Sequence, residues 1–73
     1  MYEVFDTIEL KKPLHIPHVC DLDAGSVELL ILEEDKTWTG AVRQNGEITH
    51  LCIDHVLRED AMEDVREWMK EGE

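Results

Sequence analysis

The histidines and cysteines of this chain gather in two short clusters. The first cluster spans residues 15–20 with the spacing H-x-x-H-x-C, and the second spans residues 50–55 with the spacing H-x-C-x-x-H. Imidazole and thiolate are the ligands that zinc prefers, and residues i and i+2 of a strand share one side. One hypothesis is therefore a tetrahedral zinc site with two ligands from each cluster: His18, Cys20, His50 and Cys52.

The spacing of the histidines and cysteines is also compatible with purely structural roles for these residues. Structural zinc sites usually use C-x2-4-C knuckles or H-x3-5-H on a helix, and this sequence has neither. Cysteine is often buried simply as a small apolar residue, and two cysteines 32 positions apart suit a reducing compartment. Structural histidines and core thiols are thus the alternative to zinc, and the alternative needs no cofactor.

Catalytic motifs are missing from the sequence. It contains no G-x-S-x-G, no glycine-rich phosphate loop and no H-E-x-x-H. A dyad of Cys52 with His50 or His55 is chemically feasible, but a small domain with one helix offers little concavity for a substrate. The D-x-D-x-G stretch at 21–25 lacks the later ligands of a calcium loop and indicates a turn. We expect a protein that is not an enzyme.

Carboxylates repeat at helical spacing near the end of the chain. Glu59, Glu63, Glu67 and Glu71 follow one another at i, i+4, i+8 and i+12, with Asp60 and Asp64 beside them. Residues four apart are neighbours on a helix, so the pattern predicts an anionic face that is either a binding surface or merely solvated. Arg66 and Lys70, each three residues after a glutamate of the row, are expected to offset part of its charge.

The composition is strongly acidic. The chain has 73 residues, with 18 Asp and Glu against 7 Lys and Arg, and a formal net charge of -11. Phosphates would repel such a surface, so we expect no direct binding to nucleic acid or to an anionic membrane, and a basic protein as the partner. No apolar run approaches the roughly 18 residues that span a bilayer, so a cytoplasmic location is the default expectation.

The β-prone part of the chain covers residues 2–53. Alternation predicts a first strand over 2–10, and VELLIL at 27–32 predicts a central strand that is buried on both faces. Asn45-Gly46 predicts a type I′ hairpin that pairs Gln44 with Glu47 and, further along, Trp38 with Ile53. Between these strands we expect an extended edge segment over 14–20 and a turn over 21–26.

Helical periodicity begins near Val56. The apolar side chains from there on fall on one arc of a helical wheel, which predicts an amphipathic C-terminal helix lying on the sheet: Leu57, Ala61, Met62, Val65, Trp68 and Met69. The fold class predicted from these elements is α+β, a single domain over 1–73. It has a small antiparallel sheet of three or four strands packed by one helix.

Small size, excess acid and the anionic helix together indicate a binding protein. They are typical of small inhibitor proteins of phages and mobile elements that dock on a larger, nucleic-acid-handling host protein. The zinc module described above is the alternative function. A further alternative is an accessory subunit, or a homodimer, that uses the apolar excess on the sheet. The acids predicted to bind the basic partner are Glu59, Asp60, Glu63, Asp64, Glu67 and Glu71, with Glu33, Glu34 and Asp35.

Overall fold

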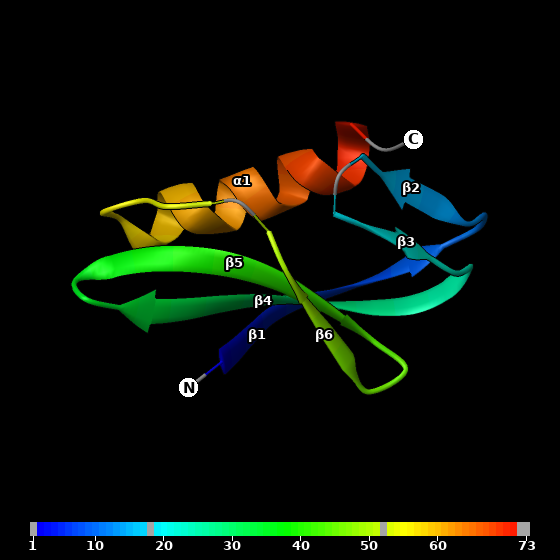
Figure 1. Ribbon diagram of the computed structural model, residues 1–73, viewed down its shortest axis with the longest axis horizontal. Coiled ribbons are helices and arrows are strands. Elements are labelled where there is room, and N and C mark those ends of the chain that lie inside the picture. Colours follow the sequence, from blue (N-terminus) through cyan, green and yellow to red (C-terminus); the bar gives the residue numbers. More distant parts are fainter. Residues whose placement is uncertain (1, 18, 52, 72–73) are drawn as a thin grey trace.

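The chain folds into two antiparallel sheets and one helix (Figure 1). The computed structural model describes residues 2–17, 19–51 and 53–71. The main sheet has the strand order β1-β4-β5-β6, and β2 and β3 pair separately. The predicted α+β class is confirmed. In chain order the elements are β1 (Tyr2–Leu10), β2 (Leu14–Ile16), β3 (Cys20–Leu22), β4 (Gly25–Glu34), β5 (Thr37–Gln44), β6 (Glu47–His50) and α1 (Arg58–Glu71).

Two tight hairpins order the main sheet. Asn45 and Gly46 have φ of 55° and 79°, and Gln44 pairs with Glu47, which confirms the predicted hairpin and its register at the turn. The β4 to β5 turn is also two residues long, with φ of 50° at Asp35 and 66° at Lys36. Both turns match the twist of a hairpin because both central residues have positive φ.

The predicted pairing of Trp38 with Ile53 is wrong, because the chain leaves the ladder after Leu51. The Leu51 N–H still donates to the Gly40 carbonyl at 3.0 Å, but the Ile53 N–H donates back to the Leu51 carbonyl at 2.9 Å. That local turn takes up two residues, so His55 is the residue that bridges Trp38. Leu51 and Ile53 nevertheless stay buried on the core face, as predicted.

Residues 14–26 hold more structure than the sequence predicts. The expected edge segment and turn are replaced by a short hairpin in which His15 pairs with Asp21, and β4 already begins at Gly25. The hairpin forms because its apolar side chains, Leu14, Ile16 and Leu22, are buried in the core beside α1 and the main sheet. Tertiary burial therefore overrides the turn-forming composition of residues 21–26.

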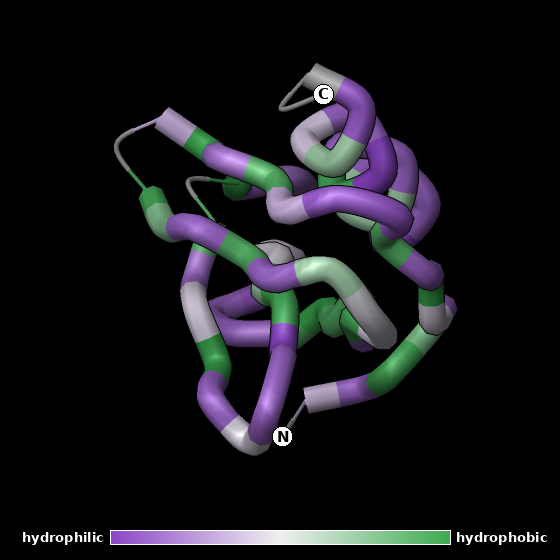
Figure 2. Tube along the Cα trace, turned by 90° about the vertical axis from the view of Figure 1, so that its right-hand side faces the viewer, coloured by the Kyte–Doolittle hydropathy of each residue, from purple (hydrophilic) through white to green (hydrophobic). Residues whose placement is uncertain are grey.

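The core lies between the main sheet and α1. Viewed along the long axis, the helix stacks over one face of the sheet, and green and purple alternate along the strands (Figure 2). Ala61, Val65 and Met69 supply the helix side of the core, and Leu29 and Ile31 are among the strand residues that meet them. As predicted, β4 is an interior strand buried on both faces, because Leu30 on its opposite face is also fully buried.

Helix α1 begins two residues later than the periodicity indicates. Val56 and Leu57 precede it and are 76% and 57% exposed. The prediction that Leu57 belongs to the core-facing arc is therefore wrong. The Ala61 N–H donates to the Leu57 carbonyl at 3.2 Å, so Leu57 occupies the N-cap position and does not lie within the helix.

Candidate functional site

The carboxylates of α1 divide into two groups. Glu59, Asp60, Glu63 and Glu67 are exposed and form no ion pair with any side chain in the described ranges. Asp64 is half-buried instead, and its Oδ2 lies 2.8 Å from Nε2 of His55. The side chain of Glu71 lies outside the described part of the chain. The predicted anionic face therefore exists, but Asp64 belongs to an internal contact.

The arginines of the helix pair with β1 and not with the described carboxylates of α1. Arg58 pairs with Glu3, and Nε of Arg66 lies 3.6 Å from Oδ2 of Asp6, with the guanidinium 5.3 Å from the ring centroid of Phe5. The expectation that Arg66 offsets the glutamate row is thus corrected. Its cation–π contact and its ion pair both direct it to the sheet.

The third arginine is committed to the sheet as well. Nε and Nη2 of Arg43 donate to the two oxygens of Glu28 at 2.7 and 2.8 Å, a parallel pair of bonds between β5 and β4. These bonds lower the pKa of Glu28 and raise that of Arg43. All three arginines therefore neutralise carboxylates of the main sheet, and none pairs with a helix carboxylate whose side chain the structure describes.

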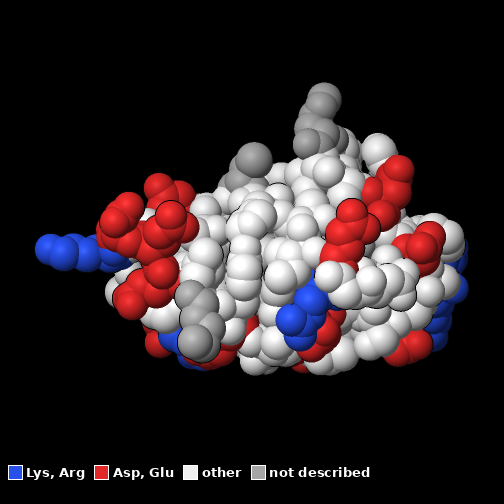
Figure 3. All heavy atoms as spheres, turned by 60° about the horizontal axis from the view of Figure 1, so that its bottom comes forward, with Lys and Arg blue, Asp and Glu red and all other residues white. Residues whose placement is uncertain are grey.

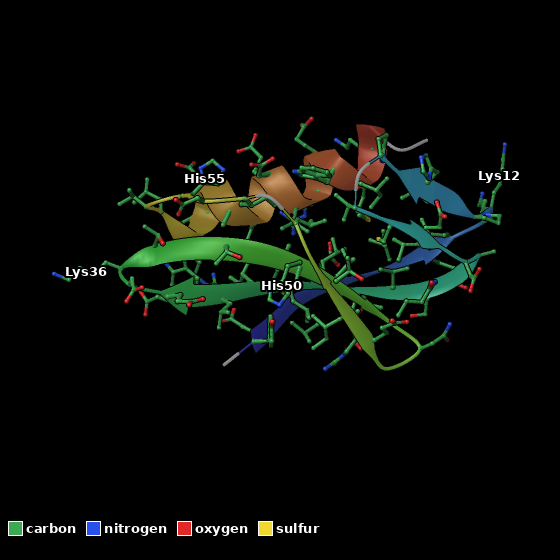
Figure 4. All side chains as sticks on the ribbon, in the orientation of Figure 1. Lys12, Lys36, His50 and His55 are labelled. Carbon is green, nitrogen blue, oxygen red and sulfur yellow. The ribbon has the colours of Figure 1, made fainter. Side chains whose placement is uncertain are left out.

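A second acidic group lies at the tip of the β4 to β5 hairpin. Glu33, Glu34 and Asp35 are exposed there beside Lys36. The bridge between Trp38 and His55 ties this hairpin to the segment that leads into α1, so the tip and the start of the helix lie at the same end of the molecule. Lys36 and His55 mark that end in Figure 4, and acidic side chains gather at the corresponding end in Figure 3.

The exposed carboxylates of α1 and those of the hairpin tip together define the candidate site. We call it the acidic surface: Glu33, Glu34, Asp35, Glu59, Asp60, Glu63 and Glu67. Sequence reasoning named each of these residues, but nothing in the sequence placed the hairpin tip next to the helix start. That proximity arises from the bridge between Trp38 and His55, which the predicted register did not contain.

The described zinc candidates lie on opposite faces of the main sheet. Burial raises the pKa of the Cys20 thiol and the nearby Thr49 side chain lowers it; the neighbour of Thr49 across the ladder is the core residue Val42. His50 faces the other way and meets the hydroxyl of Tyr2. His18 and Cys52 lie outside the described residues, and the others contain no group of three metal-binding side chains. The zinc site stays a prediction, which metal analysis and melting in chelator would test.

The face of the main sheet that α1 does not cover carries apolar side chains, for which the sequence predicted no covering element. Ala41 and Leu30 are fully buried there, and Val4 and Ile48 are 43% and 36% exposed. Tyr2 and His50 meet above the buried pair, as their ring centroids are 5.5 Å apart. Part of the apolar excess that suggested a homodimer is thus covered within one chain, and dimerisation stays a prediction.

A groove that the sequence did not indicate runs between β1 and the second half of α1. Its volume is about 310 Å³, near the lower limit for a ligand pocket, and it is open to solvent. The floor of the groove is apolar and its rim is charged. Among the described residues, its lining contains no histidine, cysteine, serine or threonine. The lining residues are Asp6, Ile8, Glu9, Leu10, Leu29, Arg66, Met69 and Lys70. That the protein is not an enzyme stays a prediction, since carboxylates and a lysine line the groove.

Likeness to known proteins does not identify the chain. No family model, curated protein or solved structure matches it. In the described ranges, no helix has both the length and the apolar character needed to cross a membrane. Its exposure, its lack of internal ion pairs among the described residues and its charge make the acidic surface the best candidate for function.

Proposed function

We propose that this protein is a non-enzymatic binding module that docks its acidic surface on a basic surface of a larger, nucleic-acid-handling protein. One observation carries the proposal. The exposed carboxylates of α1 have no ion pair within the described chain, although two arginines stand on the same helix. Charges that are not compensated internally remain available to a partner of opposite sign.

The shape of the helix row supports a basic partner that normally holds nucleic acid. Glu59, Glu63 and Glu67 repeat every four residues, which places them about 6 Å apart along the helix axis. A regular series of anions on a rigid rod resembles the phosphates along a nucleic-acid strand. A protein whose anionic helix occupied the nucleic-acid channel of its partner would act as an inhibitor of that partner, as the sequence predicts.

The proposal is tested by charge reversal of the helix row. Immobilised wild-type protein, the double variant E63K/E67K and the control E9K/E47K would be exposed to extract of the encoding organism at low and high salt. The control reverses two exposed acids on other elements and changes the net charge equally. Captured proteins would be identified by mass spectrometry.

The expected result is one set of basic, nucleic-acid-binding proteins that wild type and control retain at low salt. E63K/E67K should lose this set, and high salt should release it from wild type and control, because salt screens exposed charges beyond about 10 Å at 0.1 M. Equal capture by E63K/E67K and wild type, with the same dependence on salt, would overturn the proposal.

A further inference from the structure

Val56 and Leu57 are the two most exposed large apolar residues of the described chain. These residues are 76% and 57% exposed, against 43% and 36% for Val4 and Ile48, the next in order. They are adjacent in sequence and directly precede α1. Neighbouring apolar side chains that stay in water on a small monomer mark an interaction site more often than isolated ones do.

Neither helix capping nor packing accounts for a leucine at position 57. Leu57 accepts the first backbone bond of α1, from the Ala61 N–H at 3.2 Å, and so occupies the capping position. Serine, threonine, aspartate or asparagine would stabilise the helix there by about 1 kcal/mol, and leucine cannot cap. Because Leu57 neither caps nor packs, stability does not account for it.

The segment that carries the pair is fixed to the rest of the fold. The backbone of His55 makes two hydrogen bonds with Trp38 of β5, at 2.6 and 2.9 Å. Its ring bonds Asp64 of α1 at 2.8 Å, so His55 joins the sheet to the helix immediately before Val56. A partner that buries Val56 and Leu57 would therefore have little loop motion to freeze.

The charges around the pair indicate which kind of partner fits. Asp54, Glu59 and Asp60 lie within three residues of the pair in sequence, and the adjacent Arg58 is paired with Glu3 of β1. The hairpin tip with its acids lies at the same end of the molecule: Glu33, Glu34 and Asp35. An apolar centre with a charged rim is the ordinary anatomy of a protein interface. A second copy of this chain would bring two anionic rims together, whereas a basic surface would neutralise the rim.

We infer that Val56 and Leu57 form an apolar anchor at the centre of the acidic surface and insert into an apolar recess bordered by lysine and arginine on the partner. The inference rests on the proposed function and adds the feature that the partner must have. The acidic rim steers the encounter and responds to salt, and the anchor supplies affinity that salt does not weaken.

Two synthetic cationic peptides of equal length and charge test the anchor. One peptide intersperses lysine with leucine, and the other intersperses lysine with serine. Binding would be measured by calorimetry for wild type, for V56S/L57S and for the matched control V4S/I48S. The control removes the same kind of exposed apolar surface from the sheet face. Far-UV circular dichroism would confirm that each variant is folded.

Wild type and control should bind the leucine peptide at least about tenfold more tightly than the serine peptide, since burying two aliphatic side chains exceeds one decade in affinity. V56S/L57S should bind both peptides equally and at the wild-type strength for the serine peptide. A leucine preference that persists in V56S/L57S overturns the anchor but leaves the proposed function standing.

Two other results are informative. If neither peptide binds wild type in a salt-dependent way, the proposed function itself fails. If sedimentation shows that wild type self-associates and V56S/L57S does not, the occupant of the anchor is a second copy, and the inference of a basic partner is wrong.

Discussion

The hydroxyl of Tyr2 lies 2.5 Å from Nε2 of His50, which joins the two edge strands of the main sheet across its helix-free face. Between these strands, Leu30 of β4 and Ala41 of β5 are fully buried although no helix covers them. The contact between Tyr2 and His50 thus covers this face of the sheet, as a second layer of secondary structure would. It also holds the His50 ring on the side of β6 away from Cys20.

Removing the Tyr2 side chain should cost more stability than removing its hydroxyl. Y2F loses one hydrogen bond and should lower the free energy of unfolding by about 1 kcal/mol. Y2A also exposes Leu30 and Ala41 and should lower it by about 2 kcal/mol or more. Urea denaturation measures both values. Equal losses for the two variants would show that the ring covers nothing.

Gly40 should not tolerate even a methyl group. A Cβ atom there would overlap Cγ2 of Val65 and lie 2.8 Å from Cδ1 of Ile53, so the close approach of β5 to the helix requires glycine. We expect G40A to lower the free energy of unfolding by about 1 to 3 kcal/mol, the usual range for overpacking.

A second substitution separates this clash from a backbone effect. V65A removes the overlapping methyl groups, so G40A should cost at least about 1 kcal/mol less in a V65A background than in wild type. Urea denaturation of the four proteins gives the coupling energy. If the two substitutions were additive, Val65 would not be the residue that G40A displaces.

The pair of Arg43 and Glu28 should make stability depend on acid. Because Arg43 lowers the pKa of Glu28 below its ordinary 4.5, the pair stabilises the fold above that pH, and its contribution disappears as the pH falls through the lower folded value. The difference in stability between wild type and E28Q should be constant near neutral pH and shrink below about pH 4.5.

Arg43→Lys supplies the control for this pair. Lysine keeps the positive charge but cannot form two parallel bonds, so the variant should retain only part of the pH-dependent difference. Urea denaturation across the acid range measures it. A difference between wild type and E28Q that grew toward low pH would contradict the assigned direction of the shift.

Local sequence patterns were sufficient for most of the fold. Asn45-Gly46 determines its own turn, and the apolar run at 27–32 determines a strand buried on both faces, because both effects act within a few residues. The pairing of Trp38 with His55 could not be predicted, since it depends on a local turn that no strong turn signal marks. The β2 and β3 hairpin depends on burial against residues far along the chain.

In the acidic surface, too, local spacing predicted some features, and others depend on contacts with distant parts of the chain. Spacing alone identified Glu59, Glu63 and Glu67, but it assigned Arg66 to them because it considers only neighbours on one helix. The sheet offers Arg66 both Asp6 and the Phe5 ring, which no periodicity reveals. Helical period likewise assigned Leu57 to the core, because period does not say at which residue a helix begins.

The helix row should oppose folding, since like charges at i and i+4 repel one another and no arginine compensates them here. We expect E63Q and E67Q each to raise the free energy of unfolding by a few tenths of a kcal/mol in dilute buffer. The gain should vanish near 1 M salt, where the screening length is about 3 Å. Urea denaturation at two salt concentrations measures it.

Asp64 provides the matched control on the same helix. Its carboxylate meets the His55 ring at 2.8 Å, so D64N should lower stability, although it removes the same charge as E63Q. If E63Q lowered stability as D64N does, the row would have a structural role and would lose its value as evidence for binding. A gain from E63Q with weaker capture of the basic partner would show that these carboxylates serve binding at the expense of stability, as expected of a functional surface.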